Sequence, residues 1–298
     1  MFRKSLLICS SLAFAISLTA GDAPPAGAKL SAAEIVDKNV AARGGLQAWR
    51  AVQTISMSGK LGAGGNQRGA LPVPAPAGRK SGPRATPLAQ RPVEEVQLPF
   101  VMELARPGKM RFELEFNGQT AIQVFDGANG WKLRPFLGRR VVEPYTTEEM
   151  KVATMQADLD GPLVDYAAKG TVIELDGMEK VEGRDTYKVK LTMKNHQAIH
   201  VWIDAQTFLE AKIEGQPRRL DGIDHPVEVY FRDFRPVNGL QIPFVLETRV
   251  LQVGKTALGM KDPPVPPEKV IIEKAVVNPK LDESRFAKPQ IGVSSNAN

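Results

Sequence analysis

The chain has 298 residues, of which 43% are hydrophobic, and it carries a formal net charge of +6. A chain of this length buries a large enough core to fold without disulfide bonds. Its single cysteine, Cys9, excludes an internal disulfide framework. The modest positive charge favours anionic partners only weakly.

The first residues have the pattern of a secretory signal peptide. Arg3 and Lys4 form a positively charged start, and residues 6–18 form an apolar run that is followed by small residues. This run is shorter than the ~20 apolar residues that a membrane span needs. We therefore expect cleavage after Ala20, with residues 1–20 as the signal peptide, and a soluble periplasmic protein.

The segment before the main strands contains one helix and one insertion. Residues 21–30, rich in Ala, Pro and Gly, predict a flexible leader. Ser31 and Glu34 form a capping box, which predicts a helix that ends at the following glycine pair. Residues 62–92 are rich in proline and predict a long loop inserted between two strands. It is not a domain boundary, because too few residues precede it to form a separate core.

Apolar and polar residues alternate over residues 110–115, which is the period of a half-buried strand. The Asn-Gly pair that follows marks a hairpin. A two-residue loop would set Glu113 opposite Ile122. A three-residue loop over residues 116–118 sets Phe112 opposite Ile122 instead, and it keeps one face apolar. We prefer the three-residue loop for this reason.

Similar alternation elsewhere predicts about ten antiparallel strands, each with one apolar face. The run from Thr146 to Glu149 can cap a helix that begins near Met150. So large a twisted sheet rarely stays flat. We expect either a closed, packed barrel or an incompletely curled sheet with the helices as a lid over an apolar cavity. The fold class is α+β, mainly β, with one domain over residues 31–289 and a flexible tail over residues 290–298.

Four patches resemble one known family. Residues 106–112 read Arg-Pro-Gly-Lys-Met-Arg-Phe, and residues 125–136 contain the pattern D-G-x-x-x-W-x-x-x-P-F. Residues 281–289 and the stretch from residue 44 to residue 55 are similar to the closing and opening parts of the same family. That family is the periplasmic lipoprotein-carrier superfamily, of the LolA/LolB-like outer-membrane lipoprotein-sorting type. The resemblance implies an incomplete half-barrel with a helical lid over a cavity for acyl chains.

The resemblance also implies site residues. The arginine of the family's Arg-Pro pair matches Arg106, which would act as a latch by bonding carbonyl groups of the lid, here residues 146–168. Unbranched methionine side chains repack easily around varied acyl chains. We predict that the cavity is lined by the following apolar residues: Met102, Leu104, Met110, Phe112, Leu114, Ile122, Val124, Met150, Met155 and Leu163.

Motifs for catalysis are absent from the sequence. It contains no Gly-x-Ser-x-Gly elbow, and its only thiol lies in the predicted signal peptide, which we expect to be removed. We expect no catalytic residue, no metal ion, no cofactor and no nucleic-acid partner. The function we predict is a monomeric carrier that shields acyl chains of a lipid or lipoprotein. One alternative is an envelope stress sensor or interaction module with a membrane-anchored protein partner, and another is an enzyme acting on an envelope lipid.

Overall fold

The structure, a computed structural model, describes residues 30–64, 95–135, 139–220, 222–255, 262 and 264–290. The predicted signal peptide, most of the predicted leader and most of the proline-rich insertion lie outside these residues, as does all but the first residue of the predicted tail. Within the described part of the chain, helices α1, α2 and α3 accompany thirteen strands that form a single antiparallel sheet.

The elements have the following bounds. The helical elements are α1 (Ala32–Ala42), α2 (Leu46–Ala51), α3 (Thr147–Gln156) and the 3-10 helix η2 (Glu283–Phe286). The strands are β1 (Thr54–Ala63), β2 (Val96–Ala105), β3 (Lys109–Phe116), β4 (Gln119–Phe125), β5 (Gly130–Arg134), β6 (Arg139–Pro144), β7 (Val172–Val181), β8 (Arg184–Thr192), β9 (Ala198–Asp204), β10 (Glu210–Leu220), β11 (Ile223–Val237), β12 (Leu240–Val250) and β13 (Glu268–Val277).

The sheet consists of two meanders, β1 to β6 and β7 to β13, which are joined because β1 pairs with β13. Its order is β6-β5-β4-β3-β2-β1-β13-β12-β11-β10-β9-β8-β7, so β6 and β7 form the two edges. The sheet is curved and open, which confirms the predicted incomplete barrel and excludes the closed one. The predicted number of about ten strands is too low. An edge strand such as β7, most of whose residues are exposed, has no continuous buried face, so counting apolar stripes underestimates the strands.

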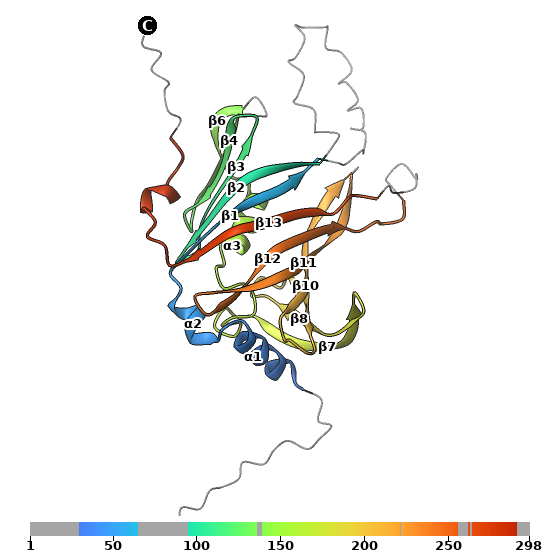
Figure 1. The fold of residues 1–298 in the computed structure, drawn as a ribbon. Helices are drawn as coiled ribbons and strands as arrows, with labels where there is room; N and C mark the ends of the chain where they lie inside the picture. The colour runs from blue at the N-terminus through green and yellow to red at the C-terminus, as the bar shows by residue number, and fades with distance from the viewer. Residues whose placement is uncertain are drawn as a thin grey trace, which may run out of the picture. The chain divides into compact units, whose positions relative to one another are not determined.

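Both helix starts that the sequence marks are present. Ser31 and Glu34 exchange hydrogen bonds as a capping box at α1, which confirms that prediction. Thr146 and Glu149 do the same at α3, so this helix begins at Thr147, three residues before the predicted start near Met150. Helix α3 lies against the sheet and contacts β5, and Figure 1 shows the sheet curving around it.

The predicted register of the β3–β4 hairpin is wrong. Phe116 pairs with Gln119 across a two-residue loop, and both loop residues have positive φ. Glu113 therefore lies opposite Ile122, as the rejected alternative required. A shift of one residue moves a strand's side chains to the other face. Ile122 and Val124 consequently lie on the opposite face from Phe112.

One face of the β3–β4 hairpin mixes charged with apolar residues, because Arg111 lies opposite Val124 and Glu113 lies opposite Ile122. The C-terminal segment explains why this face is stable. Strand β3 contacts η2, and Arg111 donates to the carbonyl oxygen of Arg285 at 2.9 Å. The Arg285 guanidinium in turn binds the carboxylates of Glu103 and Glu113. Phe286, at the end of η2, is buried. The alternating pattern of the strand predicts that these charged side chains face solvent. In the structure they instead form ion pairs and a hydrogen bond with the distant C-terminal segment.

Candidate functional site

The face of the sheet beneath α3 is identified by pairing. Met102 pairs with Phe112, which pairs with Gln123, which pairs with Lys132 on β5. Directly paired residues lie on the same face. The Lys132 ammonium donates to both carboxylate oxygens of Glu149 on α3, so this is the face that the helix covers.

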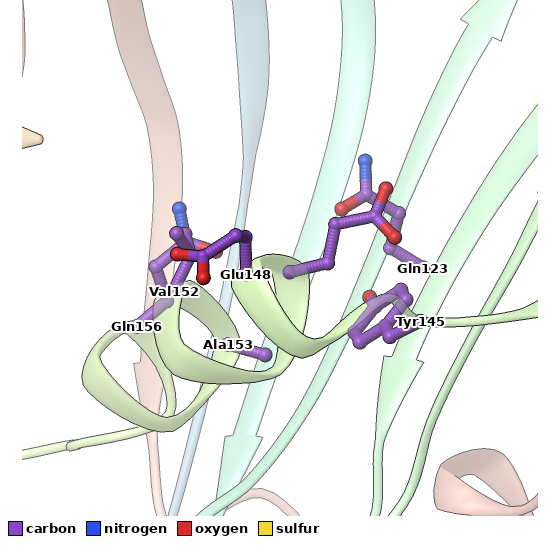
Figure 2. A pocket seen from close by; sticks show the side chains of 7 residues that line it. Gln123, Tyr145, Glu148, Val152, Ala153 and Gln156 are labelled. Atoms are coloured by element: carbon purple, nitrogen blue, oxygen red, sulfur yellow. The ribbon is translucent and has the colours of Figure 1, made fainter. Parts of the chain in front are cut away.

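A pocket of about 210 Å³ opens between α3 and this face. Figure 2 shows Glu148, Val152 and Gln156 along the helix, with Gln123 and Tyr145 across from them. Residues four apart share a helix face, which explains the alignment of the first three. The lining consists of Gln123, Tyr145, Glu148, Glu149, Val152, Ala153 and Gln156.

Tyr145 is positioned by a glycine. A Cβ atom at Gly130 would lie 1.9 Å from the Tyr145 ring, so only glycine leaves space for the ring at this point. The Tyr145 N–H also donates to the Gly130 carbonyl oxygen at 2.9 Å. The Tyr145 hydroxyl oxygen is buried and has no hydrogen-bond partner among the described residues. Burial raises the pKa of Tyr145, and the charge of Glu149 adds to the effect, so the hydroxyl stays protonated.

Glu149 connects the pocket to the start of the helix. Burial alone would raise the pKa of Glu149, but hydrogen bonds from Lys132 and Thr146 and the charge of Lys132 outweigh it and lower the pKa. The Lys132 side chain is only 8% exposed. A charged carboxylate on α3 and a buried ammonium on β5 therefore hold the N-terminal end of the helix on the sheet.

Arg106 holds the segment that follows α3. Its Nη2 donates to the buried Asp160 carboxylate at 2.5 Å, and to the Trp49 carbonyl oxygen at 3.1 Å. Its Nε donates to the Val52 carbonyl oxygen at 2.6 Å. Arg106 thus contacts the predicted lid segment through a carboxylate, whereas the carbonyl groups that it bonds belong to α2 and to Val52, which follows this helix.

Three more cations hold the lid base, which we define as residues 157–170. Arg43 donates to the Asp160 carbonyl oxygen at 3.1 Å, and Arg50 binds both carboxylate oxygens of Asp165. Lys169 binds the carboxylate of Asp158 and lies within the lid base itself.

The carboxylates of the lid base differ in their protonation. Burial raises the pKa of Asp158, although Lys169 opposes the shift. The hydrogen bonds from Arg50 lower the pKa of Asp165. The sequence prediction of lid helices over residues 146–168 is correct only for α3, because the lid base consists of turns with positive φ at Gly161 and Asp165.

The ten predicted cavity residues do not gather around the pocket. Five of them, on β2 and β3, share the face beneath α3: Met102, Leu104, Met110, Phe112 and Leu114. Ile122 and Val124 lie on the other face, Met150 and Met155 are half-buried on α3, and Leu163 is buried in the lid base. None of the ten lines the pocket. Five of the seven residues that line this pocket are of polar type, although the surface they present to it is mainly apolar, so a search for apolar residues misses them. The predicted cavity of ten apolar residues stays a prediction.

No group of His, Cys, Asp and Glu side chains among the described residues is arranged to hold a metal ion. None of the helices in that part of the chain has the length and apolar character needed to cross a membrane.

A curved, open antiparallel sheet with a helix against its inner face defines a half-barrel fold. Among solved structures, the chain is similar to a LolA superfamily protein from Nitrosomonas europaea, with 12% identity and a TM-score of 0.51, covering 87% of this chain and 99% of that one. It is also similar to a DUF1329 family protein from Desulfovibrio piger, with 11% identity and a TM-score of 0.50, covering 86% and 97%. The chain shares its fold with these proteins, which confirms the predicted fold resemblance. No family model and no curated protein matches the sequence.

Proposed function

We propose that this protein is a periplasmic binding protein that shields an apolar chain of a lipid or lipoprotein between α3 and the inner face of the sheet. The observation that carries the proposal is the pocket of about 210 Å³ under one side of α3. Its volume lies below the roughly 300–1,000 Å³ of pockets that enclose drug-sized ligands. It therefore accommodates the end of a chain, and a longer chain requires α3 to move away from the sheet.

The two ends of the lid support such a movement. In the part of the chain that the structure describes, one ion pair, between Lys132 and Glu149, holds the N-terminal end of α3 on the sheet. The lid base is held by Arg43, Arg50 and Arg106, which come from outside it. An opening that breaks the single ion pair leaves the lid base in place. The apolar face of β2 and β3 lies beneath, and each methylene group buried there contributes ~0.8 kcal/mol.

The acidic residues of the lining fit a binding role better than a catalytic one. Glu149 is engaged by Lys132 and by the cap of its own helix, so it is not available as an acid or base. Glu148 is largely exposed and pairs with Lys151. We therefore propose a protein that binds and releases its ligand unchanged, and the signal-peptide pattern of residues 1–20 favours the periplasm as its location.

A pocket-filling substitution tests the proposal. Val152→Trp places a large ring in the pocket, whereas Lys151→Trp places the same ring on the exposed side of the helix. We expect the parent chain and Lys151→Trp to bind the neutral dye phenylnaphthylamine with equal affinity. Val152→Trp should lose at least about tenfold in affinity. Equal binding by all three chains, or no binding by any of them together with no lipid in native mass spectra of the purified protein, would overturn the proposal.

A further inference from the structure

The inner face of the sheet, which α3 covers in part, also carries a row of apolar residues outside the α3 pocket. Each residue of the row pairs with the next on the neighbouring strand, from β11 across β12, β13 and β1 to β2. The residue on β2 lies four positions before Met102, so the row is on the same face as α3. We call these five residues the apolar row: Phe231, Leu246, Val270, Leu61 and Leu98.

The apolar row is more accessible than the same face of the sheet at β8 and β9. There Val189 and Val201, which connect to β11 through the pairing of Ile213 with Val229, are almost completely buried. All five residues of the apolar row, in contrast, are half-buried. Four strand spacings of ~4.8 Å give the row a length of ~19 Å along the sheet. Accessible apolar surface of this kind is typical of ligand-binding grooves.

An ion pair lies beside the apolar row. Glu268 precedes Val270 by two residues on β13 and therefore lies on the same face. Its two carboxylate oxygens accept hydrogen bonds from the Arg218 guanidinium on β10, at 2.7 and 2.9 Å. Because β11 and β12 lie between these strands in the sheet, the pair crosses the inner face above them, where Val227 and Val250 pair and are buried. The guanidinium is thus held over apolar surface.

The Arg218–Glu268 pair is accessible from solvent and can be exchanged. The two side chains are 35% and 39% exposed. Ion pairs that are open to water contribute little to stability, so breaking this pair costs little. The fork of donors on a guanidinium matches any carboxylate, and a carboxylate on a ligand can therefore make the same two hydrogen bonds. Glu268 would then turn its own carboxylate toward water.

We propose that this part of the inner face binds a long-chain fatty acid: the apolar row holds the hydrocarbon chain, and Arg218 exchanges Glu268 for the carboxylate of the ligand. The assignment rests on the proposed function, because it names the head group of the apolar chain that the protein shields. Burial of the chain supplies binding free energy in proportion to the apolar area removed from water. The guanidinium supplies the preference for an anion, and Glu268 competes with the ligand for it.

Two probes of equal chain length test the inference: decanoate and decanol, each titrated by calorimetry at pH 7.5. Arg218→Gln should weaken the binding of decanoate by about 5–10-fold. Glu268→Gln removes the competing carboxylate and should strengthen the binding of decanoate by about 3–10-fold. Decanol should bind the parent chain and both variants with equal affinity, because it has no charge for Arg218 to select.

Each charge variant has a matched control. Arg219→Gln removes the charge of the neighbouring arginine, which pairs with Asp224. Glu174→Gln removes a carboxylate from the exposed pair with Lys190. Both controls change the net charge as the test variants do, and they should change the affinity for decanoate by less than about twofold.

A substitution in the apolar row separates the chain from the head group. Leu98→Asn should weaken decanoate and decanol alike, by about 3–10-fold, because it removes apolar surface from the row. Leu251→Asn, at an exposed position after β12, is its control and should change neither affinity.

The outcomes distinguish this inference from the proposed function. Opposite effects of Arg218→Gln and Glu268→Gln, limited to decanoate, are the expected result. If both variants strengthen both probes, the ion pair only restricts access to the row, and the head-group assignment is wrong. It is also wrong if neither variant changes the affinity for decanoate, or if native mass spectra show a dimer that covers the row and excludes both probes. If neither the probes nor phenylnaphthylamine binds to any chain, the proposed function itself fails.

Discussion

Two lysine side chains in this protein are equally buried, each 8% exposed, and each forms an ion pair with a glutamate. Lys212 on β10 binds Glu228 on the neighbouring strand β11. Lys132 on β5 binds Glu149, which belongs to α3. The first pair lies within the sheet, whereas the second joins the sheet to a helix that rests on it. The Lys212–Glu228 pair is therefore held by neighbouring strands of one sheet, whereas the Lys132–Glu149 pair would break if α3 moved away from the sheet.

The polar groups around the two lysines also differ in whether they have hydrogen-bond partners. Lys212 belongs to a cross-strand ladder in which Trp202, Lys212, Tyr230 and Glu247 pair in sequence from β9 to β12. Its ammonium lies 4.1 Å from the centre of the Trp202 ring and 5.8 Å from that of Tyr230. The Tyr230 hydroxyl donates to Glu228. Near Lys132, by contrast, the Tyr145 hydroxyl has no partner among the described residues. The ladder satisfies its own polar groups, whereas a buried hydroxyl beside α3 has no partner among the described residues.

The largest effect should come from breaking the pair inside the sheet. Glu228→Ala leaves the Lys212 ammonium buried and uncompensated, and removing one partner of a buried pair costs ~3–5 kcal/mol. We expect a loss of ~3 kcal/mol in the free energy of unfolding, measured by urea denaturation, because the aromatic rings still stabilise the cation. Dye binding at the pocket should be unchanged. The control Lys190→Ala, in an exposed pair with Glu174, should cost less than ~1 kcal/mol. A small effect in Glu228→Ala would show that the ladder is not rigid.

Arg106 tests the lid base in the same way. Arg106→Ala removes the donor to Asp160, whose side chain is 6% exposed. Lys169 lies 4.0 Å from the other carboxylate oxygen of Asp160 and partly compensates the charge. We therefore expect a loss of ~2 kcal/mol, below the full cost of an uncompensated buried charge. If Arg106 is a latch, amide hydrogen exchange should also accelerate over residues 157–170. A loss of stability without faster exchange there would contradict the latch.

Gly130→Ala tests whether the pocket depends on the position of Tyr145. The added methyl group collides with the ring, and insertion of extra volume into a packed site costs ~1–3 kcal/mol. We expect ~1–2 kcal/mol, because Tyr145 is half-buried and can move outward. The affinity for phenylnaphthylamine should decrease with it, because Tyr145 lines the pocket. Gly177→Ala, where a Cβ atom meets nothing within 4 Å but φ is positive, would lower stability without changing that affinity.

Local signals were predictable from the sequence, and long-range ones were not. The capping boxes at Ser31 and Thr146 involve residues three apart, so the sequence contains both partners. Arg106 was singled out through its motif and contacts the segment after α3, and its role as a latch stays a prediction. The β3–β4 register depends on Arg285, which lies far along the chain and pairs with the charges that alternation assigns to solvent. The pocket lining depends on the position of Tyr145 over Gly130, which no local pattern indicates.

The smallest effect concerns pH and the N-terminal end of α3. The pKa of Glu149 is lowered in the folded protein, mainly because Lys132 and Thr146 outweigh its burial. Its stabilisation is therefore present above the ordinary pKa of 4.5 and is lost as the pH falls below that value through the lowered pKa. Because the Glu149 side chain is 36% exposed, we expect less than ~1 kcal/mol.

The contribution of Asp158, in the lid base, to stability has the opposite dependence on pH. Its raised pKa means that its protonated form is favoured on folding, and this contribution is present below the ordinary value of 3.8 and lost as the pH rises through the raised pKa. Acidification below pH 4.5 should therefore loosen the start of α3 before it affects the lid base, where the contribution of the lowered pKa of Asp165 is lost only as the pH falls below the ordinary value of 3.8. Hydrogen exchange of α3 amides should accelerate with falling pH, relative to the intrinsic rate, in the parent chain. Glu149→Gln should remove that dependence, and its persistence in the variant would assign the effect to another group.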